Sequence, residues 1–206
     1  WATSVHPTRF RNRICRTDGF LSLDRGTGND AVGGSARSGN LNDAILRIGC
    51  YSVSLADTQE DIRDAQELRA LCFSTIGLDQ DAFDLTCQHF LIRDNRDDRL
   101  VCCFRLLLLD PEAVAEKSYA SQFYDLNLLS GFVGVIAELG RFCVHPDVAE
   151  TDVIRAAWGG LTNFVDAHDV RLLMGCSSFA GTDPDLYSDS FAHLNAQHLA
   201  PERWRP

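Results

Sequence analysis

An apolar stretch at residues 132–144, FVGVIAELGRFCV, constrains the fold of this chain more than any other feature. Valine, isoleucine and phenylalanine dominate it and Pro146 follows it, so it predicts a buried β-strand. Two charged residues, Glu138 and Arg141, interrupt the stretch. Beyond it, apolar residues follow the i, i+3, i+4 spacing of an amphipathic helix packed on a sheet, which we predict at 152–167.

The spacing of the two charges poses a geometric question. Side chains of a strand alternate between its faces, so Glu138 and Arg141, three residues apart, are expected on opposite faces. Gly140 between them is a natural place for a β-bulge, which would let the two converge. Burying either charge alone would cost several kcal/mol, so each needs a polar partner or a cleft. The pattern leaves a structural pair and a reaction site both open.

The whole chain has the size and composition of one domain with a substantial core. It has 206 residues, of which 45% are hydrophobic. No window approaches 18 apolar residues, and the N-terminus carries no apolar stretch of signal-peptide type. These features predict a cytoplasmic protein whose membrane contact, if any, is peripheral, at the inner membrane face.

Charge is distributed unevenly along the chain. Residues 1–47 hold seven arginines and four acids, whereas residues 48–206 hold twelve bases and twenty-five acids. An acidic body of this kind repels a phosphate backbone, which excludes a nucleic-acid-binding role. Residues 1–44 are also rich in Gly and Ser, so we predict a flexible N-terminal extension there and a folded domain at 45–206.

The eight cysteines do not suggest a disulfide framework or a metal site. Most lie in apolar runs, and no CxxC or Cys/His pair has the spacing of zinc ligands. We interpret them as reduced core residues and predict no metal.

The remaining elements alternate irregularly, which predicts a three-layer α/β (α+β) fold with a mixed central sheet flanked by helices. The first helix begins at Asp57 or Thr58 with Glu60 and Asp61 as capping-box partners, and buries a stripe that includes Cys72. The other predicted elements are a strand at 48–55, a hairpin of 89–93 and 99–109, a loop or short helix at 112–131, a strand at 170–178 and a helix at 185–197.

Several familiar site motifs are absent, since no GxGxxG, GxxxxGK[ST] or GxSxG occurs. What remains is a set of polar residues in apolar surroundings, namely Arg69, Asp81, Asp84, Arg105, Glu138 and Arg141. A solvated position would explain Arg69, and a capping role would explain the two aspartates. Arg105 is the sole charge inside an apolar strand, so its guanidinium must meet a carboxylate, a phosphate or several carbonyls.

Four segments, ELRALCF, DQDAFD, CCFRLL and AELGRF, resemble the acyl-homoserine-lactone synthases in order and rough spacing. Those enzymes have the GNAT-type acyltransferase fold and draw on acyl carrier protein. The resemblance places Arg69 and Phe73 on the helix, Asp81 and Asp84 as paired acids, Arg105 on a strand, and Glu138 and Arg141 in an ExxR motif.

A second group of segments, SQFYDLNLL, ELGRFCVHPD, GCSSFAGTDP and HLAPERWRP, is more similar to another branch. They resemble the L-ornithine N-alpha-acyltransferases of bacterial ornithine-lipid synthesis, also labelled hemolysin-like, over residues 48–206. One departure weakens the lactone-synthase alternative, and another, from ordinary GNAT enzymes, concerns the acyl donor. The aromatic-rich segment of lactone synthases, with its tryptophan, is absent after Phe73. The loop at 146–151 has two acids and no glycine, which fits a donor on acyl carrier protein better than free coenzyme A.

The resemblance implies transfer of a 3-hydroxyacyl group from acyl carrier protein to the α-amine of ornithine or a similar amino acid, with no permanently bound cofactor. Glu138 would accept the ammonium proton, with Arg141 beside it in the catalytic motif. Arg105 and Arg141 would orient the amino-acid carboxylate or the phosphopantetheine phosphate. Asp81 and Asp84 would receive the cationic side chain of ornithine, and Arg69 and Phe73 complete the expected substrate site.

Two alternatives stay open at this point. One is another GNAT activity, either an acetyl-coenzyme A N-acetyltransferase or a lactone synthase. The other is a non-catalytic module that binds acyl carrier protein, for which we expect Glu138 and Arg105 in a closed, buried salt-bridge network. The chain also ends at Pro206, before the two further strands of many GNAT domains, so we expect a C-terminally truncated domain.

Overall fold

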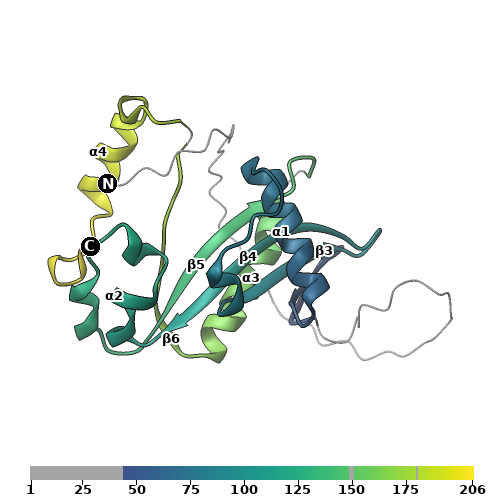
Figure 1. Cartoon of the computed structure of the whole chain (residues 1–206), viewed down its shortest axis with the longest axis horizontal. Coiled ribbons are helices and arrows are strands. Elements are labelled where there is room, and N and C mark those ends of the chain that lie inside the picture. Colours follow the sequence, from purple (N-terminus) through teal and green to yellow (C-terminus); the bar gives the residue numbers. More distant parts are fainter. Residues whose placement is uncertain (1–43, 149–150, 180) are drawn as a thin grey trace.

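The computed structural model describes residues 44–148, 151–179 and 181–206 (Figure 1). The predicted N-terminal extension at 1–44 lies almost wholly outside the described residues. One six-stranded sheet runs through the described part in the order β1-β2-β3-β4-β5-β6. Its strands are β1 (Leu46–Ile48), β2 (Tyr51–Leu55), β3 (Gln88–Asp94), β4 (Arg99–Leu109), β5 (Val135–Val144) and β6 (Val170–Gly175). All neighbours are antiparallel except β5 and β6, which are parallel, so the predicted mixed sheet is confirmed.

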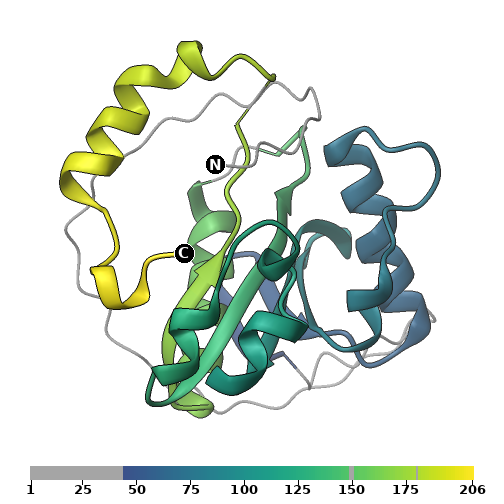
Figure 2. The same ribbon diagram turned by 60° about the vertical axis from the view of Figure 1, so that its left-hand side comes forward.

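Helices cover both faces of this sheet (Figures 1 and 2). The α-helices are α1 (Gln59–Phe73), α2 (Val114–Lys117), α3 (Thr151–Ala167) and α4 (Ser188–Gln197). Six short 3₁₀ helices connect them in the described residues: η1 (Ala82–Leu85), η2 (Pro111–Ala113), η3 (Ala120–Gln122), η4 (Asn127–Gly131), η5 (Pro184–Tyr187) and η6 (Glu202–Trp204). The short elements η2 to η4 and α2 occupy the segment predicted as a loop or short helix.

The predicted strand at 48–55 is wrong in one respect, because the segment folds back on itself. β1 and β2 form a hairpin in which Ile48 pairs with Tyr51 across a two-residue turn. Gly49 in that turn has a φ of +58°, the left-handed conformation that such tight turns require. The turn at Gly49 and Cys50 lacks the usual Asn-Gly signature, so the alternating pattern resembles one strand.

Helix α1 begins as the sequence predicts. The Thr58 hydroxyl accepts a hydrogen bond from the Asp61 N–H at 3.1 Å, and the Asp61 carboxylate accepts one from the Thr58 N–H at 3.3 Å. This capping box satisfies two backbone donors that a helix start would otherwise leave unpaired. The helix buries Ala65, Leu68 and Cys72 against the sheet, and Arg69 lies beside them in the same buried stripe.

The face of the sheet covered by α3 carries the larger core. Alternate side chains of β3 and β4 point to it, so Phe90 and Phe104 stack with ring centroids 4.5 Å apart. Phe164 of α3 meets Phe90 edge to face at 5.2 Å. Gly160 lets the helix approach closely, since a Cβ atom there would lie 2.6 Å from the Val53 side chain. The predicted packing of the 152–167 helix on the sheet is confirmed.

The opposite face is shared by α1 and by the connecting segment between β4 and β5. Residues of α1 pack on Leu91, Cys103 and Cys143. The short helices after β4 form a second apolar cluster with Ile136 and with β4's last residues. Trp204 of η6 packs edge to face on Phe132 at 5.3 Å, which brings the end of the chain to this cluster.

Strands β4, β5 and β6 are neighbours, as predicted for 99–109, 132–144 and 170–178. β5 begins at Val135 rather than at residue 132, and β6 ends at Gly175, three residues early. β6 is half-buried rather than buried because it is the last strand of the described sheet. The two parallel strands pair as far as Leu139 and Gly175, after which β5 continues with β4 as its partner.

Helix α4 lies apart from the sheet. Helix α4 starts at Ser188, three residues later than predicted, because Pro184–Tyr187 form a 3₁₀ turn first. Figures 1 and 2 show α4 at the end of a long connection beyond β6, away from the layers. No helix in the described part of the chain is long and apolar enough to cross a membrane.

The cysteines in the described residues are free thiols, and most occupy the predicted core positions. Cys72, Cys102, Cys103 and Cys143 are buried. Cys176 is exposed, so the prediction that it lies in a buried strand is wrong. Cys15 lies outside the described residues.

Candidate active site

The ladder between β4 and β5 is irregular where the sequence predicts a bulge. Cys103 pairs with Cys143, and Arg105 pairs with Gly140. One residue of β4, Phe104, therefore faces two residues of β5, and the extra residue is Arg141. Arg141 has a φ of 52°, which is rare for a residue with a side chain.

This bulge turns the Arg141 side chain to the α1 face of the sheet. Glu138 pairs opposite Leu107, on the same face as Arg105, because residues two apart on β4 share a face. Arg141 reaches the same aspartate, Asp81, as Arg105 does. The predicted irregular ladder near Gly140 is confirmed, and both Glu138 and Arg141 have polar partners.

Three arginines and three aspartates form a closed ring on this face. Each guanidinium bridges two carboxylates and each carboxylate bridges two guanidiniums, so the charges of the six residues cancel. The ion-pair distances around the ring are Arg69–Asp79 2.9 Å, Asp79–Arg141 3.0 Å, Arg141–Asp81 3.1 Å, Asp81–Arg105 2.7 Å, Arg105–Asp84 2.6 Å and Asp84–Arg69 2.8 Å. We call this set the charge ring.

The sequence positions of the ring explain how the fold assembles it. Arg69 comes from α1, Arg105 from the centre of β4 and Arg141 from the bulge of β5, while the aspartates come from the loop before and within η1. Asp81 and Asp84 also close a capping box around η1, since the Asp81 carboxylate accepts from the Phe83 N–H at 2.9 Å. The ring thus ties one loop to a helix and two strands.

The ring has a buried side and a solvent-facing side. Arg69 is 1% exposed and Asp84 is 6% exposed, whereas Asp81 and Arg141 are 24% and 25% exposed. Burial raises the pKa of Asp84, but the hydrogen bonds and charges of Arg69 and Arg105 outweigh it and hold that pKa well below its usual range. The pKa of Asp81 is lowered in the same way, with burial opposed by Arg105 and Arg141.

These contacts change the roles expected for three residues and add a fourth. The solvated position suggested for Arg69 is wrong, because its guanidinium is buried between two aspartates. Asp84 has both oxygens bonded to arginines and to Gln66, so its partners are not those of a free ornithine site. Arg105 lies inside the closed network that the non-catalytic alternative predicts for it. Asp79 completes the ring and was not singled out from the sequence.

Glu138 stands outside the ring and is held by backbone donors. Its Oε2 accepts a hydrogen bond from the Tyr119 N–H at 2.7 Å, and its Oε1 accepts one from the Ala120 N–H at 2.7 Å. The side chain is 5% exposed. Burial raises the pKa of Glu138, and the two N–H donors and the charge of Arg105 oppose this without cancelling it. A carboxyl group with a raised pKa and a fixed orientation suits proton transfer.

Tyr119 links Glu138 to the ring. Its backbone N–H binds Glu138, while its aromatic ring lies beneath the Arg141 guanidinium, 5.5 Å from the Cζ atom. Phe83 meets the Tyr119 ring edge to face at 5.6 Å, and Phe123 flanks it at 5.5 Å. An aromatic wall therefore borders the solvent-facing side of the ring. The sequence did not indicate Tyr119, because it binds Glu138 through its backbone N–H, a group that does not depend on residue type.

Two further residues complete the surroundings. Phe73 is half-buried and packs against the apolar cluster of Ala65 and Cys103, so the structure gives it a packing role. His89 is buried, and its Nε2 atom lies 3.0 Å from the Asp84 carbonyl oxygen. Burial is the main reason that the pKa of His89 is lowered. The imidazole is therefore neutral at neutral pH, and its Nε2–H donates to the Asp84 carbonyl oxygen.

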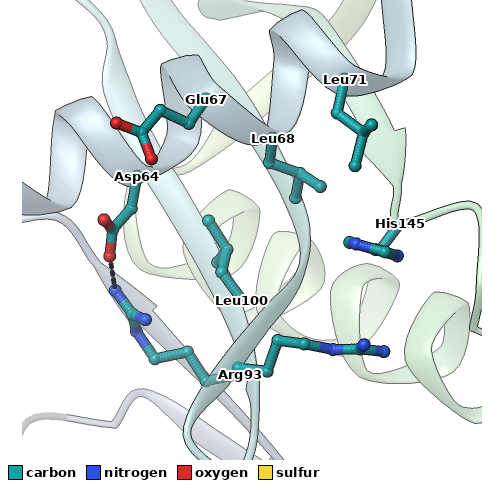
Figure 3. A pocket seen from close by; sticks show the side chains of 8 residues that line it. Asp64, Glu67, Leu68, Leu71, Arg93, Leu100 and His145 are labelled. Atoms are coloured by element: carbon teal, nitrogen blue, oxygen red, sulfur yellow. Dashed lines mark hydrogen bonds and ion pairs between the residues drawn. The ribbon is translucent and has the colours of Figure 1, made fainter.

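A surface cavity of about 320 Å³ lies between α1, the β3–β4 hairpin and His145, and is lined by none of the predicted site residues (Figure 3). Figure 3 shows Leu68, Leu71 and Leu100 between an acidic end, where Asp64 binds Arg93, and His145 at the other end. Among the described residues, no group of three or more His, Cys, Asp or Glu side chains is arranged to hold a metal ion.

Sequence similarity to known proteins shows the family of the chain. A family model described as an acetyltransferase (GNAT) domain matches residues 65–159, which span α1 to the middle of α3. The chain is 34% identical to the L-ornithine N(alpha)-acyltransferase of Rhodobacter capsulatus, and the alignment covers 76% of this chain and 67% of that protein. The chain belongs to the L-ornithine N(alpha)-acyltransferase family. It is therefore an acyltransferase with the GNAT fold, as the sequence predicts.

Two further relatives carry the same name at lower sequence identity. The acyltransferase is 29% identical to the protein of the same name from Brucella abortus, over 79% of this chain and 65% of that protein. It is 27% identical to that from Agrobacterium fabrum, over 95% of this chain and 70% of that protein. The chain thus spans about two thirds of the length of these curated relatives.

Solved structures show a looser similarity. The acyltransferase is similar to the AHL synthase LasI, with 20% identity, a TM-score of 0.47, and coverage of 61% of this chain and 71% of that one. It is also similar to FeeM, an N-acyl amino acid synthase from uncultured soil microbes, with 13% identity, a TM-score of 0.46, and coverage of 70% and 76%.

Proposed function

We propose that this acyltransferase moves a 3-hydroxyacyl group from acyl carrier protein to the α-amine of ornithine, giving a lyso-ornithine lipid. The observation that carries the proposal is the family membership, since the relatives are named for ornithine as the acceptor. The placement of Glu138 beside the charge ring supports it, because the reaction needs a base and a means to hold a charged amino acid.

The chemical step requires one proton acceptor. The ornithine α-ammonium loses a proton to the Glu138 carboxylate, directly or through one water, and the free amine attacks the thioester carbonyl carbon. A C–N bond forms and the C–S bond breaks, the attacking nitrogen loses its second proton to the departing thiolate, and Glu138 releases the first proton to solvent. General-base assistance of this kind is typically worth roughly 10²–10⁴-fold in rate. Glu138 meets the requirement because its carboxyl group is fixed by two N–H donors and its pKa is raised.

The acceptor binds at the solvent-facing side of the charge ring. Arg141 and Asp81 are the two exposed members, and they form the longest ion pair of the ring at 3.1 Å. An amino acid that inserts there places its carboxylate on Arg141 and its side-chain ammonium on Asp81. One internal ion pair is replaced by two, and the ring keeps its charge balance. Arg69, Arg105 and Asp84 hold this edge in place from the buried side.

The donor is presented on acyl carrier protein. GNAT enzymes take their acyl groups as thioesters, and coenzyme A enzymes hold the pyrophosphate on backbone N–H groups at a helix start. The loop before α3 here has acids and no glycine, which disfavours a pyrophosphate. The strands β5 and β6 part after Leu139 and Gly175, and the pantetheine arm passes through this opening.

A direct assay tests the proposal. Purified protein is incubated with ornithine and either 3-hydroxyacyl-acyl carrier protein, 3-hydroxyacyl-coenzyme A or acetyl-coenzyme A, and products are identified by mass spectrometry. Lyso-ornithine lipid formed from the carrier protein alone supports the proposal. Acetylated ornithine from acetyl-coenzyme A would establish the other GNAT activity instead. No product from any donor, in protein whose melting curve shows it is folded, would favour a non-catalytic carrier-protein module.

A further inference from the structure

The two N–H groups that bind Glu138 come from a turn that is closed by serine side chains. Helix α2 ends at Lys117, and Ser118 is extended, with φ −77° and ψ 154°. The chain reverses there, so that the next two N–H groups point out of the turn toward Glu138. The Ser118 N–H itself still bonds to the Val114 carbonyl at 3.2 Å, which anchors the turn to the end of α2.

Two reciprocal hydrogen bonds fix this turn. The Ser118 hydroxyl accepts from the Ser121 N–H at 3.0 Å, and the Ser121 hydroxyl donates to the Ser118 carbonyl at 2.8 Å. Ser118 is 1% exposed, so its hydroxyl is shielded from water, while Ser121 is half-buried. The turn lies over the carboxylate of β5, and nothing else in the described residues donates a hydrogen bond to Glu138.

We propose that Ser118 is a positioning residue for Glu138, because its buried hydroxyl holds the 118–121 turn whose two N–H groups fix the carboxylate. This inference rests on the proposed function, in which Glu138 is the base. Backbone donors stabilise the ionised carboxylate and fix the direction of its free lone pairs. Without the serine hydroxyl, the turn loosens and both 2.7 Å bonds lengthen together.

The sign of the effect on titration follows from these bonds. The N–H donors lower the pKa of Glu138 against the larger, raising effect of burial. Weaker donors therefore let the pKa of Glu138 rise further. Since the ionised form is the base, the acidic limb of the kcat profile moves to higher pH. A merely structural serine would lower thermal stability without moving this limb.

The test uses Ser118→Ala in the full chain, with Ser130→Ala as a matched control. Ser130 lies in the same connecting segment, and its hydroxyl donates to the Asn127 carbonyl at 2.7 Å without touching the turn. Selective ¹³C labelling of glutamate reports the pKa of Glu138 by NMR, and turnover with carrier-protein donor gives the pH profile. In Ser118→Ala we expect both midpoints, the NMR titration of Glu138 and the acidic limb of the kcat profile, to rise by about half a pH unit or more. We expect kcat to fall several-fold while KM for ornithine is unchanged. Ser130→Ala should match the unaltered chain.

Ser118→Thr keeps the hydroxyl and should restore both midpoints toward the original values. If Ser118→Ala does not fold, Ser121→Ala removes the second bond of the turn and should shift the midpoints in the same direction. An unshifted Glu138 pKa in the folded variant overturns the positioning role. If the Glu138 pKa shifts in Ser118→Ala but a separate Glu138→Gln variant keeps full turnover, the effect of the turn on Glu138 stands and the assignment of Glu138 as the base is overturned.

Discussion

Glu138 and Arg141 lie three residues apart on β5, yet both contact Tyr119 on the same face of the sheet. Glu138 accepts the Tyr119 N–H at 2.7 Å, and the Arg141 guanidinium lies 5.5 Å above the tyrosine ring. A regular strand forbids this arrangement, because side chains three apart point to opposite faces. The bulge opposite Phe104 provides it, and the positive φ of Arg141 is its backbone signature. The ExxR spacing thus describes a bulged strand rather than an ion pair.

Replacing Glu138 by glutamine separates a base from a structural acceptor. Among the described residues no arginine is ion-paired to Glu138, so the substitution strands no buried positive charge there. The amide turns one NH₂ toward a backbone donor, which should lower the free energy of unfolding by about 1–3 kcal/mol. We expect kcat to fall by about 10²-fold or more in a protein that stays folded at 25 °C. Turnover and Tm are measured together, with the exposed Glu116→Gln of α2 as control. Normal turnover with an unchanged Tm would contradict both roles.

The charge ring predicts unequal costs for its two paired acids. Asp84→Asn leaves Arg69 and Arg105 buried without their shared carboxylate, and should cost about 3–5 kcal/mol of unfolding free energy. Asp81→Asn acts on the solvent-facing side, where water can replace the carboxylate, so the loss should be clearly smaller. Urea unfolding of both variants gives the comparison. Equal losses would show that the ring is not graded by burial.

Much of this site was predictable because a buried charged side chain needs an oppositely charged or strongly polar partner. An arginine in the centre of an apolar strand demands carboxylates, and Arg105 finds Asp81 and Asp84, the two acids that the sequence places in one short turn. Gly140 next to Arg141 marks the bulge, since glycine in a strand interior often indicates an irregular ladder. Helix α1 and the β3–β4 hairpin follow from capping residues and from alternating apolar patterns.

Other structural features could not be predicted, because they do not depend on the types of residue involved. The partners of Glu138 are backbone N–H groups, which every residue except proline carries, so Tyr119 and Ala120 could not be recognised in advance. The turn in the β1–β2 hairpin is two residues long and lacks the common dipeptide, which hid it inside an alternating run. The exposure of Cys176 depends on where β6 ends, and apolar composition alone does not set that end.

The lowered pKa of His89 predicts how the free energy of unfolding changes with pH at values above those at which Asp81 and Asp84 titrate. It faces Arg69, Arg105 and Asp84, and burial lowers its pKa below the ordinary 6.5. The unfolded chain therefore binds a proton first as pH falls, so stability is full above about pH 6.5 and declines below it. The depressed pKa values of Asp84 and Asp81 add a second loss that begins near their ordinary 3.8 and continues downward. Tm measured from pH 8 to 4.5 should fall less steeply in His89→Gln, and parallel curves would contradict the assignment.

Gly175 marks the point where β5 and β6 part, and it tests whether that opening matters. A Cβ atom at this position would lie 2.5 Å from the Leu139 carbonyl oxygen, a backbone atom that cannot turn aside. Gly175→Ala must therefore push the strands apart, which should lower the free energy of unfolding by about 1–3 kcal/mol. Gly131→Ala is the matched control, because a Cβ there meets nothing within 4 Å and its φ is not positive. If the donor arm passes between the strands, KM for the acyl carrier protein rises in Gly175→Ala while KM for ornithine stays near its original value. Equal changes in both constants, or none in a folded variant, would place the donor path elsewhere.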